Sequence, residues 1–372
     1  MLFQEVIGQE ELKRHLIDEV NGGKISHAQL FLGKPGFGGL ALALAFTQYL
    51  FCENRTAKDS CGTCPSCSKI MKLQHPDLHF SFPTVQTVAK ISNENIAEWR
   101  EQVLETPYFD LNKWIDKIDP KGRRSIIGTA ESAEIVKKLS LRSFEGGYKV
   151  MIIWMAEEMN QDCANKLLKI IEEPPQKTLF LLVTDSQDKM LQTILSRTQV
   201  LKIPRVQLDE LINYLSRGKG LNASGAESIA GRSDGDVIEA DELSGSHEDQ
   251  ENNREHFIQL MRVCYKKSVL EMMEWADVMA KETRMHQKDF LAYALHMFRQ
   301  SMLRNYTEDH LTRVSEKEDE FLEKFARFIT GNNINDFMKT FNDAHYHIER
   351  NANARLLFTN LCFEVMRYIH KA

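Results

Sequence analysis

The sequence predicts an α/β domain built on a parallel sheet, followed by a region that is helical throughout. From His27 to Ile203, short β-rich runs alternate with helix-periodic segments, as in parallel α/β sheets. The glycine-rich stretch "GKPGFGGLAL", residues 33–42, directly follows the apolar run "AQLFL". From Phe257 to the end the pattern is helix-periodic without a proline, which is typical of a helix bundle.

Composition limits the classes of protein to which this chain can belong. At 372 residues it is long enough for two or three domains. A net charge of -6 and a sequence pI near 6.1 argue against a broad basic face, so any DNA contact should be local or shared with partners. Seven cysteines, four of them clustered, indicate a reducing cytoplasm and a metal site.

Neither a secretory signal nor a membrane span is expected. The start "MLFQEVIGQEELKRHL" has no apolar core region. The longest uncharged run, residues 35–52, has 18 residues, but it contains Pro35, three glycines and Gln48, which suit a loop and a buried helix better.

Four strands are expected in the sheet, each an apolar run that suits a strand covered on both faces: residues 28–32, 149–154, 178–184 and 200–203. Between the second and third, Leu167, Leu168 and Ile171 form a helical stripe. Pro174 and Pro175 end that helix.

Residues 207–242 are short and helical with glycine breakers, which indicates a small second domain. The polar run "SGSHEDQENNREH", residues 244–256, reads as a linker. Beyond it we expect four or five helices, the last with Leu356, Leu357, Leu361 and Val365 on one core stripe.

The segment 84–124 has no functional assignment. It holds "NENIAEWREQVLE", which predicts a helix, and then "YFDLNKWIDKIDPKGRR". The mixed aromatic and charged residues of the second stretch indicate a surface excursion.

The glycine-rich stretch has the frame of a phosphate-binding loop, G-x-x-x-x-G-K-[ST], without its chemistry. Gly33 and Gly38 hold the two glycine positions. Gly39 stands where the lysine would reach the phosphates, and Leu40 stands where a hydroxyl would bind Mg²⁺.

Four cysteines have the spacing of a structural metal site. Cys52, Cys61, Cys64 and Cys67 lie within sixteen residues with two C-x-x-C intervals, which can close a tetrahedral Zn²⁺ site with no position left for water. Gly62 and Pro65 supply turns. Free thiols or a redox pair are the weaker alternative, and with four cysteines in place His75 is expected to pack in a loop.

The order of several motifs resembles the AAA+ clamp-loader group of bacterial DNA polymerase III, which includes gamma/tau motor subunits and delta prime subunits. The motifs are "GQEEL", "HAQLFLGKPGFGG", the cysteine knuckle, "HPDLHF", "LSLRSFEGGYKVMII", "CANKLLKIIEEPPQKTLFLLVTD" and "TILSRTQ". The resemblance implies a RecA-like AAA+ domain at residues 1–204, with an inserted zinc knuckle at residues 52–67. A small helical lid at residues 205–245 and a helical collar at residues 246–372 would follow.

Within this family the nucleotide site departs from a motor subunit at further positions. The two Walker B carboxylates fall on Trp154 and Met155, and neither can coordinate a cation. Glu157 and Glu158 lie downstream at the start of the next helix, and the sensor arginine position falls on Gly235. The resemblance therefore implies a delta prime type of subunit without ATP as a cofactor and without ATPase activity of its own.

"LSRTQ" keeps Ser196 and Arg197 of the family's S-R-C motif, with Thr198 in place of cysteine. By resemblance Arg197 would act in trans as an arginine finger on the adjacent motor subunit. Without the family context it would be an ordinary surface arginine. Thr184 matches the sensor threonine and is expected to keep only a structural hydrogen bond.

The expected function is DNA replication, as a non-hydrolysing subunit of a ring with gamma/tau and delta subunits. That ring loads the sliding clamp on primer-template DNA, and DNA binding would come through the complex. Two alternatives stay open: a gamma/tau-type ATP-hydrolysing subunit with an unusual nucleotide site, and a stand-alone zinc DNA-binding protein. The lack of flanking basic and aromatic residues speaks against the second.

Overall fold

The computed structural model describes residues 1–119, 121–244, 247–306, 314, 316–350 and 352–371. It forms two compact units: residues 1–211 with 235–239, and residues 212–234 with 240–372. The three-part division expected from the sequence stays a prediction. Within the described ranges, no helix combines the length and the apolar character that a membrane span requires.

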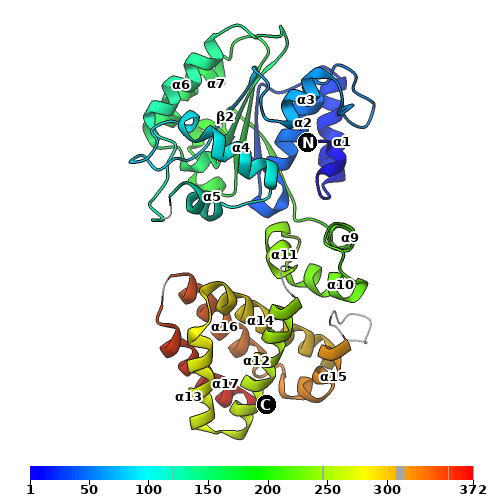
Figure 1. Cartoon of the computed structure of the whole chain (residues 1–372), viewed down its shortest axis with the longest axis vertical. Helices are drawn as coiled ribbons and strands as arrows, with labels where there is room; N and C mark the ends of the chain where they lie inside the picture. The colour runs from blue at the N-terminus through cyan, green and yellow to red at the C-terminus, as the bar shows by residue number, and fades with distance from the viewer. Residues whose placement is uncertain (120, 245–246, 307–313, 315, 351, 372) are drawn as a thin grey trace. The chain divides into compact units, whose positions relative to one another are not determined.

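The first unit is built on a sheet that lies between helices (Figure 1). The sheet has five parallel strands in the order β2-β3-β4-β1-β5. Its strands are β1 (Ala28–Leu32), β2 (Leu78–Ser81), β3 (Lys149–Trp154), β4 (Thr178–Thr184) and β5 (Gln199–Lys202). On β1, Leu30 pairs with Leu182 of β4 on one side and with Val200 of the edge strand β5 on the other. All strands run the same way, so their carboxyl ends meet at one edge, where ligands bind in open α/β sheets.

Helices cover both faces of this sheet. On one face, Leu30, Met151, Ile153 and Leu182 pack against α6 (Thr129–Ser140), α7 (Gln161–Glu172) and α8 (Gln192–Leu195). On the other face, α2 (Gly39–Phe51) contacts β1, β3 and β4. Because α2 is apolar all round, it is buried along nearly its whole length. The remaining elements of this unit are η1 (Phe3–Glu5), α1 (Glu10–Asn21), η2 (Pro35–Phe37), α3 (Pro65–Met71), η3 (Ser92–Asn95), α4 (Ile96–Glu105), α5 (Leu111–Ile118), η4 (Ala156–Glu158) and η5 (Gln187–Lys189).

Most of the expected strands are confirmed. Residues 28–32, 149–154 and 178–184 are strands as predicted, and β5 begins and ends one residue earlier than expected. The edge strand β2, inside the motif "HPDLHF", was missed. It has only four residues, and His79 and Ser81 interrupt its apolar character, so the sequence carries no run to detect.

The surface excursion expected after residue 107 is wrong. Helix α4 forms as predicted, but α5 brings Trp114 into the interior, and Tyr108 and Phe109 are buried as well. The indole of Trp114 lies edge-on to Trp99 with ring centroids 5.4 Å apart, and its N–H donates to the carbonyl of Pro83. The charged residues occupy the outer face of α5, so the segment is an amphipathic cover.

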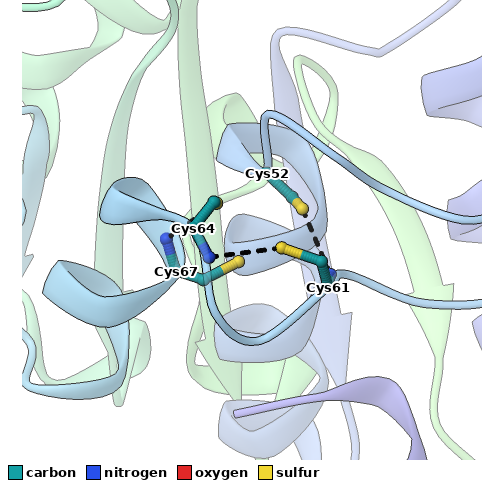
Figure 2. A group of neighbouring side chains, drawn as sticks. All are labelled: Cys52, Cys61, Cys64 and Cys67. Atoms are coloured by element: carbon teal, nitrogen blue, oxygen red, sulfur yellow. Dashed lines mark hydrogen bonds between the residues drawn. The ribbon is translucent and has the colours of Figure 1, made fainter.

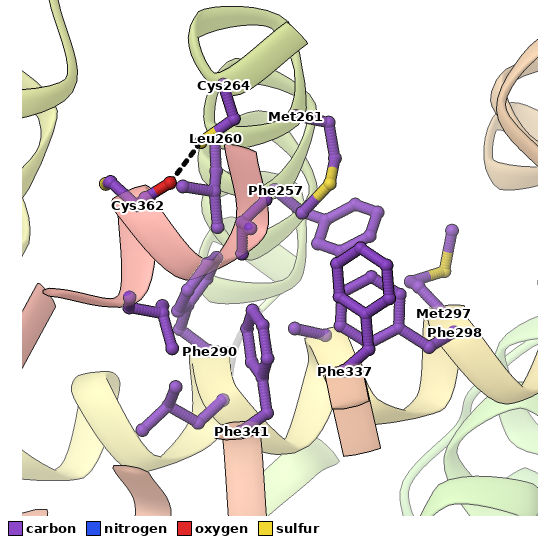
Figure 3. Packing of buried hydrophobic residues seen from close by; sticks show 14 of the residues in the cluster. Phe257, Leu260, Met261, Cys264, Phe290, Met297, Phe298, Phe337, Phe341 and Cys362 are labelled. Carbon is purple, nitrogen blue, oxygen red and sulfur yellow. Dashed lines mark hydrogen bonds between the residues drawn. The ribbon is translucent and has the colours of Figure 1, made fainter. Parts of the chain in front are cut away.

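The second unit is helical. Its first complete α-helix is α10 (Ala223–Arg232). Six further α-helices follow in the described residues after 246: α12 (His247–Lys266), α13 (Val269–Lys281), α14 (Arg284–Tyr306), α15 (Glu316–Phe325), α16 (Ile334–Glu349) and α17 (Ala354–Ile369). The short η7 (Ala326–Phe328) follows α15, while α9 (Leu208–Gly218) and α11 (Val237–Ser244) each contribute residues to both units. Phe257, Phe298, Phe337 and Phe341 pack together in the core (Figure 3).

Three expectations for this unit are corrected. The predicted linker lies partly outside the described residues, but from His247 onward it is the first half of α12, since Glu, Gln and Arg favour helices. The described bundle after residue 246 has six α-helices rather than four or five. On α17, Leu361 and Val365 are core residues, whereas Leu356 is 71% exposed.

Candidate functional site

The glycine-rich loop lies at the carboxyl edge of the sheet, between β1 and α2. The N–H of Gly33 donates to the carbonyl of Thr184 at the end of β4. Pro35 opens the 3-10 turn η2, and Gly38 ends it with a φ of 94° that only glycine adopts readily. Gln9 holds the turn by donating to the carbonyls of Phe37 and Pro204. The frame of a phosphate-binding loop is therefore formed.

The lysine position of this loop is closed by packing. A β-carbon on Gly39 would lie 3.1 Å from Cγ1 of Val183 and 3.2 Å from Cδ1 of Ile203. Leu40, at the hydroxyl position, is 3% exposed. Both positions face the protein interior, so neither could present a side chain to phosphate or Mg²⁺ without repacking.

Two side chains from elsewhere in the first unit occupy the space against the loop. A β-carbon on Gly36 would fall 1.7 Å from Oδ1 of Asp236, and one on Gly38 would fall 3.1 Å from the ring of Tyr108. Asp236 accepts hydrogen bonds from the N–H groups of Ile238 and Glu239 and so caps the start of α11. Phosphate oxygens would need this volume, and a carboxylate there also opposes an anion by charge.

Burial raises the pKa of the Asp236 carboxyl above its ordinary value. The N–H groups of Glu239 and Ile238 and the Lys34 ammonium oppose this rise, and the Asp110 carboxylate adds to it. The hydroxyl of Tyr108 accepts the N–H of Ile7 at 2.9 Å, which fixes its ring in place.

The Walker B positions are filled by hydrophobic packing. Trp154 ends β3 with 2% of its surface exposed, and its ring centroid lies 5.2 Å from that of Trp99 and 4.8 Å from that of Phe109. Met155 is buried in the left-handed region, with a φ of 52°. An aromatic cluster therefore stands where a motor subunit would hold its metal and its attacking water.

Glu157 does not restore a metal-binding carboxylate. It lies in η4, and its Oε1 accepts the N–H of Asp185 at 3.0 Å. Burial and the neighbouring Asp185 side chain raise the pKa of Glu157 to about 8. The group therefore keeps its proton at neutral pH, which makes it a poor cation ligand.

The side chain of Thr184 hydrogen-bonds to the turn that follows β4. Its hydroxyl donates to the carbonyl of Ser186 and accepts the N–H of the same residue, both at 3.3 Å. The side chain is 1% exposed, so it stabilises the turn after β4.

Arg197 lies in the turn after α8, with about a third of its side chain exposed. Its Nε donates to Oε2 of Glu172 at 3.0 Å, and Nη1 donates to the carbonyl of Thr193 at 3.0 Å. The hydroxyl of Ser196 also donates to Thr193. An exposed ion pair of this kind contributes only about 0–1 kcal/mol, so the guanidinium can be released at small cost.

The four knuckle cysteines converge as their spacing predicts (Figure 2). The sulfur atoms of Cys52, Cys61, Cys64 and Cys67 all lie within 4.8 Å of one another. In a tetrahedral site with Zn–S bonds of about 2.3 Å, sulfur atoms stand about 3.8 Å apart, so small adjustments would close the shell. Gly62 supplies a φ of 72°, and Pro65 begins α3.

Backbone amides point at these sulfurs, as a thiolate cluster requires. The N–H groups of Cys61, Cys64 and Cys67 donate to the sulfurs of Cys52, Cys61 and Cys64, respectively, at 3.2–3.4 Å. Such amides lower the pKa of Cys61 to about 6, whereas burial raises the pKa of Cys52 and of Cys67. A soft divalent cation such as zinc would favour all four thiolates, and the donor set leaves no open position for a substrate.

His75 is a packed histidine rather than a metal ligand. Its Nε2 lies 3.0 Å from Oε2 of Glu145, its Nδ1 accepts the N–H of Asp77, and its ring packs on Phe51. Lys69 of α3 pairs with the same Glu145 carboxylate.

Glu145 and Asp77 tie the loop of residues 141–147 to the knuckle. The buried Asp77 carboxylate accepts from the hydroxyl of Ser143 and from the N–H groups of Phe144 and Glu145, at 2.7–3.0 Å. The sequence places these residues in two separate motifs and does not link them. Asp236 and Tyr108 were missed as well, because each reaches the loop from a distant part of the chain.

The family model and the curated relatives that match this chain are all subunits of DNA polymerase III. Residues 8–207 match the family model described as "DNA polymerase III, delta subunit". "DNA polymerase III subunit delta'" of Bacillus subtilis is 27% identical over 259 residues, covering 70% of this chain and 66% of that protein. The Escherichia coli protein of the same name is 27% identical, covering 54% and 49%.

"DNA polymerase III subunit tau" of Escherichia coli is 26% identical, covering 57% of this chain and 27% of that protein. The matched parts thus span from about a quarter to just under two thirds of these relatives. Among solved structures, a gamma subunit-related protein of DNA polymerase III from Thermotoga maritima aligns over 97% of this chain and 98% of that chain. Its TM-score is 0.39, and the sequence identity is 15%.

Proposed function

The chain belongs to the DNA polymerase III delta subunit family, and we propose that it acts in DNA replication as a non-hydrolysing, delta prime type subunit of the clamp loader. Relatives named delta prime and relatives named tau both match it, so the family alone does not separate a fixed subunit from a motor. The state of the phosphate-binding loop supports the fixed subunit.

One observation carries this proposal: the nucleotide frame is filled by the protein's own side chains. Asp236 lies against Gly36, packing closes the position at Gly39, and Trp154 belongs to an aromatic cluster. The loop has Gly39 where a lysine would bind phosphates, and Trp154 and Met155 stand where carboxylates would hold Mg²⁺. The subunit then keeps the nucleotide-binding fold as a rigid part of the ring.

The test is a titration of the purified chain with a fluorescent ATP analogue and Mg²⁺, with a tau-type motor subunit as the positive control. We expect no saturable binding at analogue concentrations up to about 1 mM. Saturable micromolar binding would contradict the proposal and would favour an ATP-hydrolysing subunit with an unusual nucleotide site.

The positive contribution of the chain is Arg197, acting on the nucleotide of a neighbouring motor subunit. A planar, permanently charged guanidinium can stabilise charge on the transferred phosphoryl group, an effect worth about 10³-fold or more in rate. The weak ion pair with Glu172 supports this role, because it leaves about a third of the Arg197 side chain exposed. Ser196 supports the turn from which Arg197 projects.

The metal that we propose for the knuckle is a single structural zinc held by Cys52, Cys61, Cys64 and Cys67. Its contribution is to the stability of the knuckle and of the loop attached to it.

The proposed partners are gamma/tau and delta subunits, the sliding clamp, and primer-template DNA reached through the assembled ring. The helical second unit would serve as the collar that joins subunits.

A further inference from the structure

The helical second unit contains an apolar cavity of about 220 Å³ that the proposed function does not use. Met261 and Tyr265 of α12, Phe321 and Phe325 of α15, Phe328 of η7 and Ile369 of α17 supply its apolar lining. This volume is smaller than a pocket for a typical small-molecule ligand and suits one large side chain.

The walls of the cavity are fixed by aromatic packing. The ring centroid of Tyr265 lies 5.2 Å from that of Phe328. The same ring stacks on His370, with centroids 5.6 Å apart and an interplanar angle of 18°. Phe321 stacks on Phe325 at 5.1 Å. Tyr265 nevertheless keeps 53% of its surface exposed, which is unusual for a ring held on two sides. A rigid, exposed aromatic wall can bind a partner without an ordering cost.

Three cations surround this cavity, and no acidic residue is among its lining residues in the described part of the chain. They are Arg262, Lys324 and Arg327, from three different elements, and all three are exposed. None of them forms an ion pair with another described residue, although the guanidinium of Arg327 lies 4.9 Å from the ring of Phe328. The lining itself thus carries three positive charges and no negative charge, which favours an acidic partner.

We propose that this cavity binds an acidic peptide segment of a partner protein, which inserts one aromatic or long aliphatic side chain and surrounds it with carboxylates. The apolar lining would supply affinity through burial of the inserted side chain. The three cations would select the acidic flanks and speed association. A nucleic acid fits the cavity less well, because aliphatic Met261 and Ile369 share its lining, whereas sites for single-stranded nucleic acid combine stacking aromatic rings with a positively charged groove.

The test uses the full chain and a fluorescein-labelled peptide, Asp-Glu-Asp-Phe-Asp-Glu-Asp, followed by fluorescence anisotropy. We expect saturation below about 1 mM, with binding that weakens as salt rises. Replacing the peptide's phenylalanine by serine should weaken binding about tenfold or more.

Charge reversal in the protein tests the selecting role of the cations. Arg262→Glu and Arg327→Glu should each weaken binding of the acidic peptide about fivefold or more. Lys281→Glu, at the exposed end of α13 and outside the cavity lining, is the matched control and should bind as the unaltered chain does. Thermal unfolding and far-UV circular dichroism establish that each variant is folded.

Three results in the peptide experiments would overturn the inference, and a fourth comes from competition with an oligonucleotide. The first is no saturable binding by the folded, unaltered chain; the second is equal binding of the serine peptide. The third is equal effects of the cavity variants and the Lys281→Glu control. Displacement of the peptide by a single-stranded oligonucleotide at micromolar concentration would assign the surface to nucleic acid instead.

Discussion

Single side chains decide whether the glycine-rich loop can receive a phosphate. Gly33 and Gly38 keep the turn, but the atoms that would compete with a nucleotide belong to Asp236 and Tyr108. The substitutions at Gly39 and Leu40 are visible in the sequence. The blocking residues Asp236 and Tyr108 cannot be recognised in the sequence, because no local pattern places residue 236 against residue 36.

The contact between Asp236 and Gly36 can be tested by a double-mutant cycle. Gly36→Ala places a methyl group 1.7 Å from the present position of Oδ1 of Asp236 and should lower the free energy of unfolding by about 1–3 kcal/mol. In an Asp236→Ala background the same change should cost less, with a coupling of about 0.5–3 kcal/mol. Gly147→Ala is the control, because the added β-carbon would have no contact within 4 Å. Strictly additive effects in urea unfolding would contradict the contact.

Glu157 predicts a pH dependence of stability. Its pKa is raised from 4.5 to about 8, so between these pH values the folded chain binds more protons than the unfolded chain, and the free energy of unfolding falls as pH rises. Glu157→Gln stays neutral and should lack this fall. Its stability relative to the unaltered chain should therefore increase by about 1 kcal/mol or more from pH 5 to pH 8. Urea unfolding at both pH values measures the difference, with exposed Glu11→Gln as the control. An equal slope in the two Glu157 forms would refute the assignment.

Among the elements, the knuckle and the loop of residues 141–147 act together. Glu145 contacts Lys69 on the knuckle helix α3 and His75 beyond it, while Asp77 accepts three hydrogen bonds from the loop. The Lys69 ammonium and then His75 lower the pKa of Glu145, which keeps this carboxylate charged. The loop holds Phe144 with 81% of its surface exposed, so its order comes from these polar contacts and not from burial.

Loss of the Glu145 contacts, or loss of the metal from the knuckle, should make the loop of residues 141–147 more mobile. Glu145→Ala should raise amide hydrogen exchange in residues 141–147 by about tenfold or more, as expected where few contacts hold a segment. Stripping the metal with a chelator should raise exchange in both the knuckle and the loop, and the purified chain should carry one zinc. Glu134→Ala, which removes only the i,i+3 pair with Lys137 on α6, is the control. If the loop stays protected from hydrogen exchange after the metal is removed, the knuckle and the loop are not coupled.

The elements that the sequence predicts well are those with strong local patterns. The inner strands are long apolar runs, and the cysteine spacing alone brings four sulfurs together. The errors arise where tertiary contacts override a local signal. The polar residues from His247 onward form half of α12, and Trp114 is drawn inward by the aromatic cluster around Trp99.

At the scale of the whole molecule, the first unit has a nucleotide-binding frame without nucleotide chemistry, and Arg197 stands at its surface. The second unit adds a helical body that has its own cavity. We propose that the chain acts through its contacts with neighbouring subunits. The family membership and the filled loop together favour a fixed subunit in a ring of motors.

The measurement that tests this account most directly is ATP turnover by a reconstituted clamp loader containing either the unaltered chain or Arg197→Ala. We expect the variant to lower turnover, with a loss of about 10³-fold at the one site that Arg197 faces. An Arg142→Ala variant, also an exposed arginine of the first unit, should leave turnover unchanged. Unchanged turnover with a folded Arg197→Ala chain, or turnover by the isolated chain itself, would contradict the account.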